Sequence, residues 1–374
     1  MSADDLTLRV SSCTINPGAA LGSDTFTKSN PREIAGWTGV SVHRGIERCP
    51  SGFEIEFTEP LPGRSDVVVS PGDFCEVMLG SDLVLTGFVD RYMPAYSARS
   101  HAVRISGRSR SQDLVDCSVV TEKGVQFKQE SVTQIAKKLA APYGIEVNLA
   151  PGTDDGGPIE VVQVMIGESP YAVIERLCRF RALLIYDAPD GSMIISQSGK
   201  ITAASGFKEG VNVLSAAAMY SMDGRFSEYE IFLQNLDTFS DIGDGGNLIG
   251  RSTDKAVQRF RHRSVIAETA VGSPLIAEAR INWEANRRIG RSFQVRLVTD
   301  SWRDSSGKPY APNTLVPIDL PGLKMKPQTW LVGDVGYQKS SGGTTCELTI
   351  MPAGAFDPMP FLLYPQYLDV QRVM

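Results

Sequence analysis

Long apolar runs are missing from this 374-residue sequence. No stretch of about 18 apolar residues occurs, so the sequence predicts no transmembrane helix. The amino terminus is polar and acidic, and it lacks the basic start and apolar core of a secretory signal. We therefore expect the protein to be assembled in the cytoplasm in which it is made.

Signatures of catalysis and of metal binding are missing as well. The six cysteines stand singly without a CxxC pair, which argues against a zinc knuckle or a redox motif. The three histidines, His43, His101 and His262, have no metal-ligand spacing, and no GxSxG motif occurs. The glycine-rich run at 243–250 lacks the GK[ST] ending of a phosphate-binding loop. The sequence predicts neither an enzyme nor a cofactor.

Positive charge is scarce. The formal net charge is −6, and lysine and arginine form no long cluster. Proteins that bind nucleic acid without sequence preference need a basic surface. The composition therefore argues against a protein that binds nucleic acid without sequence preference, although a wall past which nucleic acid slides could also be acidic.

One acidic, glycine-rich stretch contains Asp237, Asp241 and Asp244, with Asp254 beyond it. Carboxylates at such spacing could ligate calcium. The closing glutamate of an EF-hand is absent, however, and aspartate with glycine is the usual composition of a connecting loop. We favour the loop.

Alternating apolar residues dominate the first hundred positions. The run 53–57 alternates strictly, and strand-like runs follow at 74–79, 83–89 and 101–106, separated by turn residues. Short strands at this spacing predict a small barrel or sandwich. The fold class expected for the whole chain is mainly β, with α+β parts.

Helical spacing occurs in three places. Ser131 with Gln134 is a capping-box pattern before one helix, and Ser169 with Pro170 opens a second. The two helices and the strands around them predict a small α+β module at 121–205. A third helix is expected after Ser273, ending at a glycine, Gly290.

The carboxy-terminal strands repeat the amino-terminal ones in order and with nearly constant spacing. The matched positions are Phe53, Val77, Gly87 and Val89 with Phe293, Ile318, Gly333 and Val335. We interpret this as two copies of one β domain, and the alternative is two unrelated sheets that share only the strand period. Two copies per chain would let a trimer present six nearly equivalent units around one axis.

Two segments are candidate interfaces. Arg259, Arg261 and Arg263 alternate, so a strand would place three cations on one face, toward an acidic neighbour, DNA in a channel or solvent. The segment 356–374 is rich in proline and aromatic residues, which predicts docking on a neighbouring subunit or a partner. Its candidate contacts are Phe356, Phe361, Tyr364 and Tyr367.

The run from Asp82 to Asp90, the run from Val103 to Ser118 and the closing strands around Gly333 and Thr345–Met351 resemble the baseplate hub proteins of Mu-like contractile-tailed phages. The resemblance implies a homotrimer with two tube-type β-barrels per chain. It also implies a ring that joins the six-fold tail tube to the three-fold central spike, lets DNA pass and belongs to the virion baseplate.

On that plan, the first barrel spans 1–120, and the second spans 206–235 with 290–355. The α+β module (121–205), an insert (236–289) and an extended tail (356–374) complete the chain. Two alternatives stay open. One is a tail module that binds or degrades cell-wall glycan through residues 121–205. The other is the hub part of a type VI secretion spike, although such a chain would be expected to continue beyond Met374 into a needle.

Overall fold

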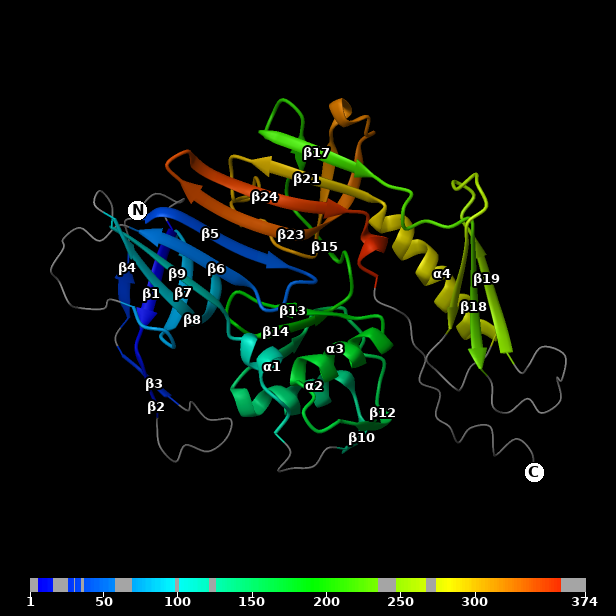
Figure 1. The fold of residues 1–374 in the computed structure, drawn as a ribbon, viewed down its shortest axis with the longest axis horizontal. Coiled ribbons are helices and arrows are strands. Elements are labelled where there is room, and N and C mark those ends of the chain that lie inside the picture. Colours follow the sequence, from blue (N-terminus) through cyan, green and yellow to red (C-terminus); the bar gives the residue numbers. More distant parts are fainter. Residues whose placement is uncertain are drawn as a thin grey trace.

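The computed structural model describes residues 6–15, 26–29, 31–34, 37–57, 69–97, 101–120, 126–234, 247–266 and 274–357. Strands contain 48% of the residues and helices 16%, so the fold is mainly β, as the sequence predicts (Figure 1). The largest sheet has fourteen strands, and the α+β module lies beside it (Figure 1). No helix in the described ranges is long and apolar enough to span a membrane.

The amino-terminal half of the large sheet is an antiparallel array ordered β5-β6-β9-β8-β7-β1-β4. Its buried positions alternate along β6, where Phe53 and Ile55 face the core and the two glutamates face out. Strands β2 and β3 form a separate ribbon. The bounds of the strands in this half are β1 (Leu6–Ser11), β2 (Cys13–Ile15), β3 (Phe26–Lys28), β4 (Arg32–Ile34), β5 (Trp37–Gly45), β6 (Gly52–Phe57), β7 (Phe74–Leu79), β8 (Asp82–Tyr96) and β9 (His101–Ser109).

The carboxy-terminal half continues the same sheet in the order β17-β21-β24-β23, and β22 pairs with β23. Two short strands, β15 and β16, run parallel to β22. The bounds here are β15 (Ile201–Thr202), β16 (Phe207–Lys208), β17 (Ser215–Tyr220), β21 (Phe293–Thr299), β22 (Thr314–Asp319), η3 (Pro321–Leu323), β23 (Gln328–Ser340), β24 (Gly343–Met351) and η4 (Ala353–Ala355).

The two halves of the sheet share one strand order. β6-β9-β8-β7 corresponds to β21-β24-β23-β22. The register of the first pair is also the same, because Ile55 faces Ile105 and, in the second half, Val295 faces Ile350. Both halves contribute to one continuous hydrophobic core.

The two halves are joined edge to edge. β5 pairs antiparallel with β23, from Gly45 opposite Asp334 to Gly39 opposite Ser340. Among the described residues, none of the sheets closes into a barrel, so two separate closed barrels per chain are not observed. Instead, β5 of the amino-terminal half pairs with β23 of the carboxy-terminal half, so the two halves form one sheet.

The α+β module has its own core and lies below the large sheet in Figure 1. Its second helix begins with a capping box between Ser131 and Gln134, and its third begins at Pro170 after the Ser169 cap, so both predicted helix starts are confirmed. Its elements are α1 (Gln112–Asp116), β10 (Gln126–Glu130), α2 (Val132–Ala140), η2 (Ala141–Tyr143), β11 (Val147–Leu149), β12 (Ile159–Gln163), α3 (Pro170–Phe180), β13 (Leu184–Asp187) and β14 (Met193–Ser196).

The insert consists of α4 (Pro274–Arg291) and a three-stranded sheet of β18 (Glu228–Gln234), β19 (Asn247–Thr253) and β20 (His262–Ile266). β18 is expected in the second β domain, within 206–235, but it pairs with β19 and β20 instead. Gly290 does not end α4. It lies within the helix, where a Cβ atom would come within 2.4 Å of the Ala355 backbone nitrogen, so glycine permits close packing on η4.

Candidate interface surfaces

The large sheet ends in an edge strand without charge. In the described part of the chain, β17 is paired on one side only, with β21. Its sequence, SAAAMY, has neither proline nor a charged residue, and Met219 and Tyr220 are 48% and 54% exposed. Proteins usually protect such an edge with lysine, proline or a bulge, because its unpaired backbone groups can accept another strand. This edge is therefore a candidate for pairing with another chain.

A second candidate edge lies at the far end of β8. β7 pairs with residues 82–88 of β8, whereas in the described ranges the segment 91–96 pairs only with β9. Pro94, within this segment, lacks an N–H group, which is typical of an edge strand. Tyr96 at the tip is 88% exposed.

A buried carboxylate holds the α+β module on the large sheet. Asp187, at the end of β13, is 2% exposed. Its carboxylate accepts hydrogen bonds from the Ser51 backbone N–H (2.8 Å) and hydroxyl (2.6 Å). It also accepts from the hydroxyls of Ser109 and Ser111, which lie in the Val103–Ser118 run. Its backbone carbonyl accepts from Arg44 (3.1 Å). These bonds fix the orientation of the module.

The predicted arginine face is only partly a strand. Arg259 and Arg261 precede β20, and Arg263 lies within it. Arg261 and Arg263 do come together, with their guanidinium groups 5.0 and 5.8 Å from the centre of the Phe226 ring. Arg259 is exposed. The insert thus presents a cationic surface that contains an aromatic ring.

The described residue of the acidic stretch, Asp254, is engaged in an ion pair and not in a calcium site. Asp237, Asp241 and Asp244 lie outside the described residues, and Asp254 forms a buried, bidentate ion pair with Arg225 (2.7 and 2.9 Å). Among the described residues, no group of three or more His, Cys, Asp or Glu side chains could hold a metal ion.

The Arg225–Asp254 pair predicts acid sensitivity of the insert. Hydrogen bonds from Arg225 lower the pKa of Asp254, so the pair stabilises the fold above the carboxyl's unfolded pKa of about 3.9 and loses this effect as the pH falls further. At neutral pH, Arg225→Ala leaves a buried carboxylate unpaired and should cost about 3–5 kcal/mol. Hydrogen exchange in β18 and β19 measures both effects. Arg251→Ala, which removes an exposed pair with Glu230, should cost less than about 1 kcal/mol.

Of the four predicted tail contacts, only Phe356 lies within the described residues, which end at Asp357. Phe356, a predicted interface residue, is 2% exposed and packs within the chain with Leu331 and Ala355. Gly333 permits this packing, since a Cβ atom there would lie 2.4 Å from the Phe356 ring. Phe361, Tyr364 and Tyr367 lie outside the described residues.

The matched repeat positions are mostly core residues. Phe53, Val77 and Val89 are buried in the first half, and Ile318 and Val335 in the second, while Phe293 is half-buried. Gly87 and Gly333, however, are not equivalent. Ile105 faces Tyr92 on β8, whereas its counterpart Ile350 faces Val332, one residue before Gly333. The sequence match between β8 and β23 is therefore displaced by several residues from their structural correspondence.

Three family models match successive segments of the chain. They are "Mu phage baseplate assembly protein GpP-like, N-terminal" (residues 27–109), "Baseplate hub protein gp44-like, second domain" (111–197) and "Mu phage baseplate assembly protein GpP, fourth domain" (273–359). Together these matches cover more than half of the chain and occur in one order.

Individual relatives agree with the models. The chain is 29% identical to the baseplate hub protein gp44 of Escherichia phage Mu over 320 residues, which cover 84% of this chain and 83% of that one. The 43 kDa tail protein of prophage MuSo2 from Shewanella oneidensis superposes with a TM-score of 0.79 at 26% identity, covering 96% of this chain and 100% of that one. The tail protein of Neisseria meningitidis MC58 has the same fold (TM-score 0.74, 18% identity, 95% and 98% covered). The fold is that of a phage tail protein. The chain belongs to the family of Mu-like phage baseplate hub proteins.

Proposed function

We propose that three copies of this chain close into a ring in the phage baseplate. Each chain contributes two similar β units, so the ring presents six units around a three-fold axis. Its role is structural, without catalysis or a cofactor: it joins the six-fold tail tube to the three-fold central spike. The relatives that are named as baseplate hub and tail proteins support this role.

The observation that carries the proposal is the junction between β5 and β23. β5 flanks the first unit beside β6, as β17 flanks the second beside β21. The outer edge of β5 is covered by β23 of the other unit. By strand order, the counterpart of β23 in the first unit is β8. The same junction would therefore place β17 of one chain beside β8 of the next chain.

The described residues contain both strand edges that this second junction would use. β17 pairs only with β21, and the segment 91–96 of β8 pairs only with β9, within the described residues. The proposed contact joins two different surfaces, β17 of one chain and β8 of the next. When such a contact is repeated with a constant rotation that closes on itself, the chains form a ring. Three chains would provide three junctions within chains and three between chains. All six would be nearly alike.

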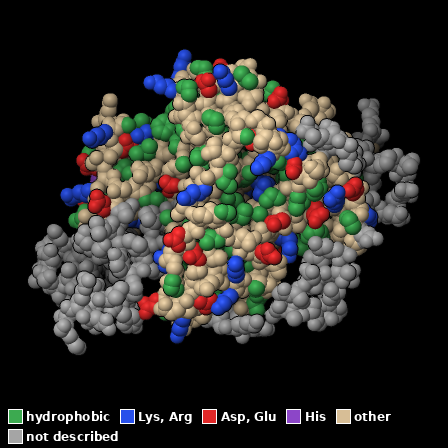
Figure 2. All heavy atoms as spheres, turned by 180° about the vertical axis from the view of Figure 1, so that it is seen from behind, with side chains coloured by type: hydrophobic (Ala, Val, Ile, Leu, Met, Phe, Trp, Pro, Cys, Tyr) green, Lys and Arg blue, Asp and Glu red, His purple; other side chains and the backbone are tan. Residues whose placement is uncertain are grey.

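The surface charge fits a ring through which DNA passes. The net charge is −6, and Figure 2 shows lysine and arginine side chains interspersed with aspartate and glutamate over the face in view. Such a surface offers little attraction to phosphate groups. The cationic surface at Arg259, Arg261 and Arg263 and the tail residues Tyr364 and Tyr367 are proposed contacts with the spike or a neighbouring chain.

The two alternatives receive less support. The apolar residues of the α+β module are buried in its own core, so they need no glycan to explain them. The match to a phage hub protein over 84% of the chain favours a tail baseplate over a type VI secretion spike.

The solution mass tests the proposal. Light scattering coupled to gel filtration should give a mass near three times the 40.6 kDa of one chain. A mass of one chain over the whole accessible concentration range would exclude a self-assembling ring.

A further inference from the structure

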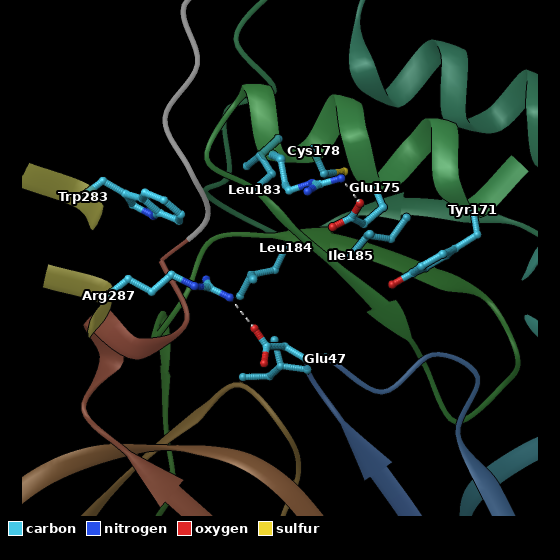
Figure 3. Close-up of a pocket in the computed structure, with 11 residues that line it drawn as sticks. Glu47, Tyr171, Glu175, Cys178, Leu183, Leu184, Ile185, Trp283 and Arg287 are labelled. Atoms are coloured by element: carbon cyan, nitrogen blue, oxygen red, sulfur yellow. Dashed lines mark hydrogen bonds and ion pairs between the residues drawn. The ribbon is translucent and has the colours of Figure 1, made fainter. Parts of the chain in front are cut away.

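A cavity of about 410 Å³, lined by apolar side chains and by four charged ones, lies where three parts of the fold meet (Figure 3). Ile46 and Glu47 line it from the segment after β5, the α3–β13 region lines it from the module, and Trp283 and Arg287 line it from α4. Leu183, Leu184 and Ile185 contribute apolar side chains that are almost entirely buried. The cavity is within the size range of small-molecule and peptide pockets, roughly 300–1,000 Å³.

The charged groups around the cavity neutralise each other. Glu47 pairs with Arg287 at 2.8 Å. Glu175 pairs with Arg179 at 2.7 Å. The remaining surface is aliphatic, with the aromatic rings of Tyr171 and Trp283 at its sides (Figure 3). An uncharged occupant with apolar side chains therefore suits this cavity better than an ion or a charged metabolite.

The last described residue of the chain is held at the cavity wall. The backbone carbonyl of Asp357 accepts hydrogen bonds from Trp283 Nε1 (2.6 Å) and from Arg287 (3.2 Å), both of which line the cavity. The Asp357 carboxylate accepts a third bond from the Ser198 hydroxyl (2.6 Å). Whatever follows Asp357 therefore starts beside the cavity.

The segment that follows has the right chemistry. Residues 358–368 read PMPFLLYPQYL and contain no charged side chain. Prolines at 358, 360 and 365 favour an extended polyproline conformation, which binds aromatic-lined grooves at a low cost in conformational entropy. Each extended residue spans at most about 3.3–3.6 Å, so residues 359–363 are within reach of the cavity.

We propose that residues 358–363 occupy this cavity within the same chain, with Phe361 and Leu362 as the buried anchors. The segment then connects α4 to the α+β module and fixes the insert relative to the large sheet. Residues 364–374 remain available for a partner. This inference does not depend on ring assembly.

Cysteine cross-linking in the full-length protein tests the inference. Glu175, which lines the cavity, is replaced by cysteine and combined in turn with Met359→Cys, Phe361→Cys or Leu363→Cys. Arg176→Cys is the matched control, because Arg176 is adjacent on α3 but does not line the cavity and pairs instead with Glu168. Disulfides formed under mild oxidation are located by mass spectrometry, and non-reducing gels separate bonds within a chain from bonds between chains.

At least one tail position should form an intrachain disulfide with the cysteine introduced at position 175. The yield of the corresponding disulfide with the cysteine at position 176 should be severalfold lower. Equal yields at the two positions, or no disulfide at any of the three tail positions, would overturn the inference. A disulfide between two chains would also overturn it, since the occupant would then be the tail of a neighbour. Circular dichroism and the solution mass of each variant identify any loss of fold, and the measurement of mass separates failure of this inference from failure of the ring.

Discussion

Replacing both Ala217 and Met219 with lysine should convert the proposed trimer into single chains. The two side chains are exposed on β17, the edge strand that we propose to pair with β8 of the next chain. Two desolvated, unpaired ammonium groups at such a junction should cost about 2–3 kcal/mol, which weakens each contact about 30- to 150-fold. Light scattering at increasing dilution measures the change.

The control is Ser340→Lys, which introduces a single lysine at an exposed end of the central strand β23. This variant should retain the mass of the wild-type protein. The double lysine variant should also keep the wild-type circular dichroism spectrum, because exposed edge lysines are compatible with strands. An unchanged mass of the double variant would remove β17 from the interface.

Asp187→Ala should release the α+β module from the large sheet. The substitution leaves the Ser51 N–H and the buried hydroxyls of Ser109 and Ser111 without their acceptor. Loss of this network should cost about 3 kcal/mol. Hydrogen exchange of amides at the interface between β13 and the sheet should accelerate by roughly 100-fold, because local opening sets their exchange rate.

Two further variants show whether the acceptor itself is responsible. Asp187→Asn keeps one acceptor oxygen and the side-chain volume, so it should cost less than Asp187→Ala. Asp190→Ala removes an exposed carboxylate from the neighbouring turn, where it accepts bonds from Ser192, and should leave the interface amides unchanged. Equal effects of all three variants would indicate that the network does not hold the module.

Local features of the fold follow directly from the sequence. The capping residues Ser131 and Ser169 predict the starts of α2 and α3, because a side-chain hydroxyl at that position satisfies a free backbone N–H. The alternation at 53–57 predicts which face of β6 is buried. These signals involve neighbouring residues and do not depend on the rest of the chain.

Features set by distant residues could not be predicted in the same way. Strands have a side-chain period of two, so a shifted alignment of β8 with β23 looks as good as the true one, and the match of Gly87 with Gly333 illustrates this error. Nothing near Asp187 in the sequence indicates that Ser51, 136 positions away, donates to it. Phe356 is followed by a proline-rich segment, and only the fold places its ring against Gly333.

The central claim is that the junction seen between β5 and β23 recurs between chains. An electron cryo-microscopy reconstruction of the purified assembly tests it most directly. We expect a three-fold ring of six similar β units in which β17 of each chain runs beside residues 91–96 of the next. A ring in which both of these edges face solvent, or an assembly without three-fold symmetry, would contradict the claim.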